Sequence, residues 1–116
     1  MTNSITNDDV QAYLRRIVEA GIFEQGSLRY RLLEHLIQTE LDGHGDTLKA
    51  YTIGLDVFEK PDTFDPSTDS SVRVGIGRLR TALAMFESSG KADIDLIVDV
   101  PVGTYRPTLT LSLIHI

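Results

Sequence analysis

The spacing of apolar residues along the chain predicts four amphipathic helices. In four segments the apolar positions recur every three or four residues, the period that places them on one face of an α-helix. Turns rich in glycine, proline and aspartate separate the last three segments, and these residues favour turns over helices. The predicted helices cover residues 8–20, 28–41, 48–58 and 70–86.

Short polar residues stand where three of these helices should begin. The side chains of Ser, Asn and Asp accept hydrogen bonds from the free N–H groups of a first helical turn, so they are preferred caps. Gly21 follows the first helix, at a position where glycine commonly ends a helix. The candidate caps are Asn7 or Asp8 for the first helix, Ser27 for the second, and Asp69 or Ser70 for the fourth.

Alternating apolar residues near the C-terminus predict two strands, at residues 95–100 and 104–113, joined by a Pro-Val-Gly turn at 101–103. Three helices and a hairpin are the minimal order of a winged helix-turn-helix domain. We therefore interpret the chain as one α+β domain of this class. The first helix, at about 7–22, would be an extension before a winged-helix core at about 27–112. The expected core residues are Leu32, Leu36, Ile53, Phe58, Val72, Ile76, Leu79, Leu83 and Tyr105.

The fourth predicted helix has a strip of small residues opposite its apolar stripe. Small residues allow a close approach, and arginines hydrogen-bond to phosphates or to guanine edges, so this face could lie in the major groove of DNA. An ordinary solvated helix face is the alternative interpretation. Ser70, Val74, Gly77 and Thr81 form the strip, with Arg73 and Arg80 on one flank and Arg78 on the other.

Two segments, VRVGIGRLR at residues 72–80 and VPVGTYR at residues 100–106, resemble the effector domain of OmpR/PhoB-type response regulators. In that family the recognition helix reads V-x-V-x-I-x-R-L-R, and the wing ends in a similar turn. Upstream blocks at residues 48–58 and 64–69 resemble a variant winged helix at the N-terminus of many bacterial tetratricopeptide-repeat and cyclase-like proteins. The resemblance covers about residues 28–110, with its blocks in the right order.

The resemblance implies a transcriptional regulator that binds specific double-stranded DNA. Residues 70–86 would be the recognition helix in the major groove, and the hairpin would be a wing near the minor groove. Gly75 and Gly77 depart from the response regulators, which often carry larger polar or basic residues there, and no receiver domain precedes the winged helix in this sequence. The implied DNA contacts are Ser70, Arg73, Gly77, Arg78, Arg80 and Thr81 in the helix and Thr104 and Arg106 in the wing, which Tyr105 would support.

The charge is unevenly distributed along the chain, which carries a net charge of −6. Residues 1–69 hold 6 basic and 13 acidic side chains, whereas residues 70–116 hold 5 basic and 4 acidic ones. An acidic body with a locally basic C-terminal half is compatible with one DNA-facing surface, and equally with a protein that avoids DNA. The alternative function is therefore a protein-interaction module that keeps this fold and modulates another regulator without binding DNA.

Other classes of function find little support in the sequence. The absence of cysteine excludes disulfides and thiolate catalysis, and it suits a reducing compartment. The polar stretch at residues 1–9 lacks the pattern of a signal peptide, so we expect a cytoplasmic protein with no membrane contact. Asp42, His44 and Asp46 lack the spacing of a calcium loop, and no serine lies in a nucleophile motif. We expect no enzyme activity, no metal and no cofactor.

The expected assembly is a homodimer, or tandem binding on repeated half-sites. A lone winged helix makes few base contacts, so useful specificity commonly needs two copies. The helix at residues 8–20 is an addition to the minimal fold, and the strand at 104–113 would leave an open edge that can pair with another chain. These two elements are the expected interface.

Overall fold

A computed structural model describes residues 5–89 and 96–111 of the chain. Within these residues the protein has an α+β fold, with four α-helices, a short 3-10 helix and a two-stranded antiparallel sheet. The predicted order of helices followed by a hairpin is confirmed. No helix of the described part is long and apolar enough to cross a membrane. The elements are α1 (Asn7–Glu19), α2 (Leu28–Leu41), η1 (Gly45–Thr47), α3 (Ala50–Asp56), α4 (Ser71–Ser88), β1 (Leu96–Asp99) and β2 (Thr108–Leu111).

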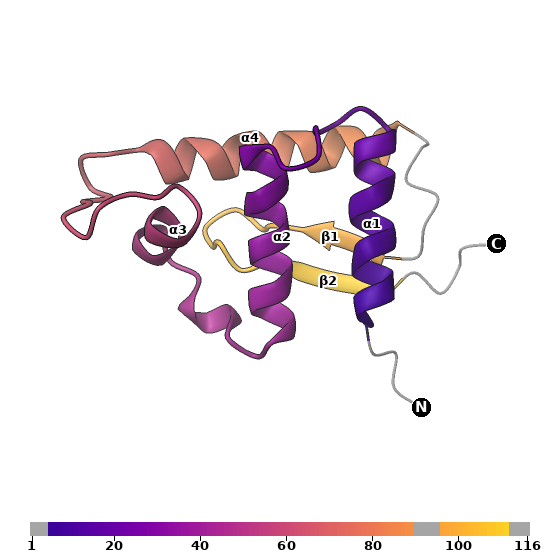
Figure 1. Ribbon diagram of the computed structural model, residues 1–116, viewed down its shortest axis with the longest axis horizontal. Helices are drawn as coiled ribbons and strands as arrows, with labels where there is room; N and C mark the ends of the chain where they lie inside the picture. Colours follow the sequence, from indigo (N-terminus) through magenta and orange to yellow (C-terminus); the bar gives the residue numbers. More distant parts are fainter. Residues whose placement is uncertain (1–4, 90–95, 112–116) are drawn as a thin grey trace.

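The elements pack so that one long face of α4 stays uncovered (Figure 1). In the figure α1 and α2 stand side by side, the hairpin passes behind them, and α4 runs across the end where α1 stops and α2 starts. The helix α3 lies beside the N-terminal end of α4. Helices and hairpin therefore cover α4 from one side only.

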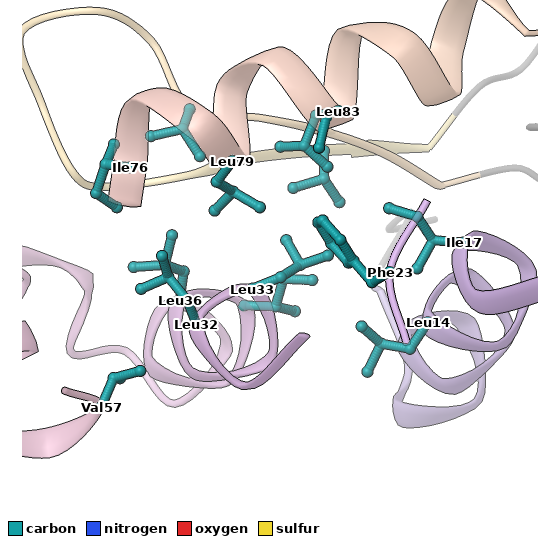
Figure 2. Close-up of a cluster of buried hydrophobic side chains, with 14 of the residues drawn as sticks. Leu14, Ile17, Phe23, Leu32, Leu33, Leu36, Val57, Ile76, Leu79 and Leu83 are labelled. Atoms are coloured by element: carbon teal, nitrogen blue, oxygen red, sulfur yellow. The ribbon is translucent and has the colours of Figure 1, made fainter. Parts of the chain in front are cut away.

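The core lies where α1, α2 and α4 meet the sheet (Figure 2). In the figure the apolar side chains of α4 point toward those of α2, and Phe23 fills the space between α2 and α1. The apolar stripe predicted on the fourth helix is confirmed, since its side chains are buried. Of the expected core residues, Leu32, Leu36, Ile53, Val72, Ile76, Leu79 and Leu83 are buried, whereas Phe58 and Tyr105 are only partly buried and pack against the core.

Tyr13 and Phe86 join α1 to the C-terminal part of α4. Their rings meet edge to face, with centroids 5.4 Å apart. The Tyr13 hydroxyl is buried and has no hydrogen-bond partner among the described residues. Burial, and to a smaller extent the charge of Glu87, raises the pKa of Tyr13 far above its usual value. The phenol of Tyr13 is therefore neutral wherever the protein is folded near neutral pH.

The cap of the second helix is confirmed, and that of the first lies one residue earlier than predicted. The Ser27 hydroxyl accepts a hydrogen bond from the Tyr30 amide at 3.2 Å. At α1 the cap is Thr6, not Asn7 or Asp8, because Thr6 and Asp9 form a reciprocal capping box. The Asp9 carboxylate reaches back to the Thr6 amide, which fixes the start of the helix at Asn7.

At α4 the Asp69 carboxylate performs the capping. It accepts hydrogen bonds from the amide of Ser71, at 3.0 Å, and from the Ser71 hydroxyl. Ser70 stands at the cap position but makes no side-chain hydrogen bond there. These bonds, with a further contribution from Lys60, lower the pKa of Asp69 to about 2.

The third helix is shorter than residues 48–58. It starts at Ala50 because Lys49 is extended, with φ −128° and ψ 160°, and its amide donates to the Thr52 hydroxyl. It ends at Asp56, before a turn in which Glu59 has a φ of 56°. The preceding glycine-rich turn contains η1, which the sequence did not predict.

The second strand starts at Thr108, not at residue 104 as predicted. Pro101 and Pro107 have no N–H to donate to a strand ladder, and Gly103 has a φ of 94°, so residues 100–107 form a loop. Leu96 pairs with Leu111 at one end of the sheet, and Asp99 pairs with Thr108 at the other. We call residues 100–107 the hairpin loop. Residue 95 of the first predicted strand and residues 112–113 of the second lie outside the described residues.

Candidate functional site

The uncovered face of α4 carries the residues predicted for it. Arg73, Arg78 and Thr81 are exposed, and so is Val74, at 45%. No carboxylate of the described residues pairs with Arg73 or Arg78, although Arg31, Lys60 and Arg106 each pair with one. Two cationic side chains that have no carboxylate partner among the described residues therefore lie on the same helix of an acidic protein.

The two glycines of α4 have different surroundings. A side chain at Gly75 would place its Cβ 2.7 Å from the Phe58 ring, which would have to move to make room, so packing favours a glycine there. At Gly77 a Cβ would meet nothing within 4 Å. Glycine in the middle of a helix costs about 1 kcal/mol relative to alanine. Packing against the described residues therefore explains Gly75 and leaves Gly77 unexplained.

A cationic groove runs between α4, the start of α3 and the hairpin loop. Lys49, Arg73 and Arg80 line it together with residues 102–105 of the loop. Val102 stands beside it as the most exposed large apolar residue in the described part, at 87%. The groove brings positive charge from two separate segments, the start of α3 and α4, to one side of α4, as expected of a surface that follows a phosphate backbone.

A second groove, more apolar, lies on the other side of α4, against the start of α2. Leu28, Phe58 and Val74 line it, together with Arg29 and Arg78. It continues past both arginines toward Met85, which is 57% exposed. Arg29 also lies over the ring of Phe23, 5.7 Å from its centroid.

Arg80 is not directed outward as the sequence predicted. It is half-buried, and its Nε donates to the carbonyl oxygen of Val100 at 2.8 Å. Its Nη2 donates to the carbonyl oxygens of Pro101, at 3.2 Å, and Thr104, at 3.0 Å. The reason is its position on the helix, between the buried stripe and the uncovered face, where the nearest polar groups are those of the hairpin loop.

Arg106 is paired with Glu40, near the C-terminal end of α2. Its Nε and Nη2 donate to the two carboxylate oxygens of Glu40 at 2.6 and 3.0 Å. Glu40 raises the pKa of Arg106 further above its usual value. The pair lies directly over Gly45, where a Cβ would collide with the Glu40 carboxylate. Thr104, also predicted as a DNA contact, is exposed and accepts from the Arg106 amide.

The structure thus brings Ser70, Gly77, Arg78 and Thr81 together on one face, and Arg73 and Thr104 to the cationic groove. Sequence reasoning missed Lys49 and Glu40. Lys49 lay inside a predicted helix with nothing to distinguish it, and Glu40 is 66 residues from its partner. Among the described residues no group of three or more His, Asp or Glu side chains could hold a metal ion.

No protein-family model matches the chain, and comparisons with curated proteins and with solved structures give no match either.

Proposed function

We propose that the protein is a winged helix-turn-helix transcriptional regulator of the bacterial cytoplasm that binds specific double-stranded DNA. In this proposal α4 is the recognition helix, and the hairpin of β1, β2 and the hairpin loop is the wing. The observation that carries it is the uncovered face of α4, where Arg73 and Arg78 have no carboxylate partner among the described residues, on either side of the open position Gly77. The family resemblance of residues 72–80 and 100–106 supports the same assignment.

The dimensions of α4 suit the major groove of DNA. Its 18 residues span about 27 Å at 1.5 Å per residue, and the groove, about 12 Å wide, admits an α-helix. With no side chain at Gly77, the helix backbone can approach the base edges. Arg78 is then the residue to hydrogen-bond a guanine, and Arg73 contacts a phosphate from the cationic groove.

Further cations for the phosphate backbone lie beside the wing, at Lys49, and within it, at Arg106. Lys49 lies across the cationic groove from the hairpin loop, and exposed Thr104 adds a hydroxyl. Arg106 reaches DNA only after leaving Glu40, because the Nε and Nη2 groups that bind the carboxylate are those that would bind a phosphate. The Arg106 side chain is 53% exposed, so water screens the pair and this exchange costs little.

The net negative charge of the protein should affect both its orientation on DNA and the salt dependence of binding. A net charge of −6 repels DNA outside the basic face, so only one orientation of the protein is favourable. Binding through phosphate contacts releases counterions, and the affinity therefore falls steeply as salt rises. We also propose a homodimer on repeated half-sites, with α1 and the outer edge of β2 as candidate interfaces, since β2 pairs only with β1 in the described sheet.

The direct test selects bound sequences from a random double-stranded DNA library. The enriched sequences are then footprinted, and their affinity is measured as a function of salt concentration. Arg78→Ala should cost about 1–3 kcal/mol and relax specificity at one base pair, whereas Arg73→Ala should weaken all sequences alike. Arg31→Ala is the matched control, because this exposed arginine of α2 lies outside both grooves beside α4 and outside the candidate dimer interfaces. The proposal is overturned if no sequence is enriched, or if the three variants bind alike.

The second candidate function is binding of a protein partner. The observation that favours it is the apolar groove, where exposed Val74 and Leu28 lie beside Arg29 and Arg78. Aromatic and apolar residues with arginine, and without lysine, are typical of protein interfaces. Partner binding through this groove should respond weakly to salt and be lost in Val74→Glu, which leaves all arginines in place.

A further inference from the structure

The hairpin loop has few backbone hydrogen bonds of its own. In the described residues 100–107 the amide of Thr104 donates to the carbonyl of Pro101 at 3.3 Å, and the amide of Arg106 donates to the Thr104 hydroxyl at 3.0 Å. Its ends are anchored by buried Val100 and Pro107 and by partly buried Tyr105, but Gly103 and the two prolines add no backbone donor that would define the shape of the exposed turn. A loop of this kind needs contacts from outside to hold one conformation.

Arg80 supplies such contacts to both limbs of the loop. Its Nε and Nη2 bind the carbonyls of Val100 and Pro101 on the outgoing limb, and Nη2 also binds that of Thr104 on the returning limb. The three donor–acceptor distances lie between 2.8 and 3.2 Å, within the normal range for N–H···O bonds. One planar group on α4 therefore sets both the width of the turn and its distance from the helix.

We infer that Arg80 is a positioning residue, which fixes the hairpin loop against α4 and contributes to ligand binding only through that loop. This inference rests in part on the proposed function, in which the loop belongs to the wing. Arg80 orders the loop before DNA arrives, so less conformational entropy is lost on binding. The guanidinium matters for its shape, since a lysine has the same charge but lacks the rigid fork that holds several carbonyls at once.

The substitution Arg80→Lys therefore distinguishes a positioning role of Arg80 from direct contact with DNA. If Arg80 contacted a phosphate, Arg80→Lys would keep most of the affinity, because lysine also binds phosphate as a point charge. If Arg80 positions the loop, Arg80→Lys should resemble Arg80→Ala. Arg73→Lys is the matched control, because Arg73 lines the same groove and makes no hydrogen bond to the loop among the described residues.

The experiment measures amide hydrogen exchange at Thr104 and Arg106 in the free protein, then DNA affinity against salt. In Arg80→Lys and Arg80→Ala both amides should exchange about ten-fold faster, the change expected when about one net hydrogen bond of stability is lost. Their affinities for the selected DNA should fall equally. Circular dichroism confirms folding, and Arg80→Gln, a shorter neutral donor, is the third variant in case Arg80→Ala unfolds.

Each outcome decides between the two proposals. Unchanged exchange at Thr104 in all three variants overturns the inference, as does wild-type affinity in Arg80→Lys with a loss in Arg80→Ala. Faster exchange in a protein that binds no DNA supports the positioning role of Arg80 and overturns the DNA-binding proposal alone. Faster exchange together with an equal loss of affinity supports both.

Discussion

The helices and the hairpin loop are held in place by different forces. The four helices are fixed by an apolar core in which no polar or charged residue of the described part is buried. The hairpin loop is anchored in that core by Val100, and its exposed part is held by hydrogen bonds from Arg80 and by the pair between Arg106 and Glu40. One small domain thus combines a scaffold that tolerates little change with a loop whose exposed part depends on a few polar groups for its position.

The largest expected effect is a loss of core packing. Phe86→Ala removes a fully buried ring that contacts Tyr13 edge to face, and it should lower the free energy of unfolding by about 3–5 kcal/mol. Urea unfolding followed by circular dichroism measures this. If the hairpin loop were as important to stability as the core, Arg80→Ala would cost as much, and a comparable loss would contradict the contrast between the two regions.

The two glycines of α4 should respond in opposite directions. Gly75→Ala forces the Phe58 ring to move and should destabilise the protein by about 1–3 kcal/mol. Gly77→Ala meets nothing, so it should stabilise the helix by up to about 1 kcal/mol. If Gly77 is needed for close approach to base edges, the same substitution should weaken DNA binding. A stabilised Gly77→Ala with unchanged affinity would show that the glycine has no such role.

Asp69→Asn should remove a pH-dependent contribution to stability. The pKa of Asp69 is lowered from 3.8 to about 2 by its hydrogen bonds to Ser71 and by Lys60. The ionised carboxylate therefore stabilises the folded state above the unfolded pKa, and this contribution is lost as the pH falls from about 4 to 2. The thermal unfolding temperatures of the wild-type protein and of Asp69→Asn should differ at neutral pH and become equal near pH 2. A constant difference across this range would exclude the charge of Asp69 as the cause.

The smallest expected effect concerns Glu40. Glu40→Gln breaks an exposed ion pair, so thermal stability should hardly change. DNA affinity should rise by less than about ten-fold, because Arg106 no longer has to leave a carboxylate. In an Arg106→Ala background Glu40→Gln should have a smaller effect. An equal gain in both backgrounds would mean that only the net charge matters.

Much of the helical part could be predicted from the sequence, because the buried positions of a helix appear as apolar residues every three or four positions. Val72, Ile76 and Leu79 follow the helical period, and each proved to be buried. The starts of the helices were harder to predict. At α1 several polar residues are adjacent in the sequence, and only the geometry of Thr6 and Asp9 identifies the cap. The third helix was overextended because Leu48 and Phe58 continue the apolar period beyond the hydrogen-bonded turns.

The candidate site could be predicted only in part. The face with Arg73 and Arg78 follows from helix geometry alone. The direction of Arg80 does not, because its side chain lies between two faces and its partners are carbonyls about 20 residues away. The pairing of Arg106 with Glu40 has no sequence signal, since any of several acidic residues could have met that arginine.

The buried phenol of Tyr13 gives the protein an internal optical marker. The chain has four tyrosines and no tryptophan, so its near-ultraviolet absorption belongs almost wholly to tyrosine. Because burial raises the pKa of Tyr13, its neutral form stabilises the folded state, and this stabilisation declines once the pH exceeds about 10, the value for an unfolded tyrosine. In an alkaline titration the tyrosinate absorbance of Tyr13 should therefore rise at a higher pH than in the unfolded chain, and the part of the signal that Tyr13→Phe removes reports the opening of the junction between α1 and α4 without any added label.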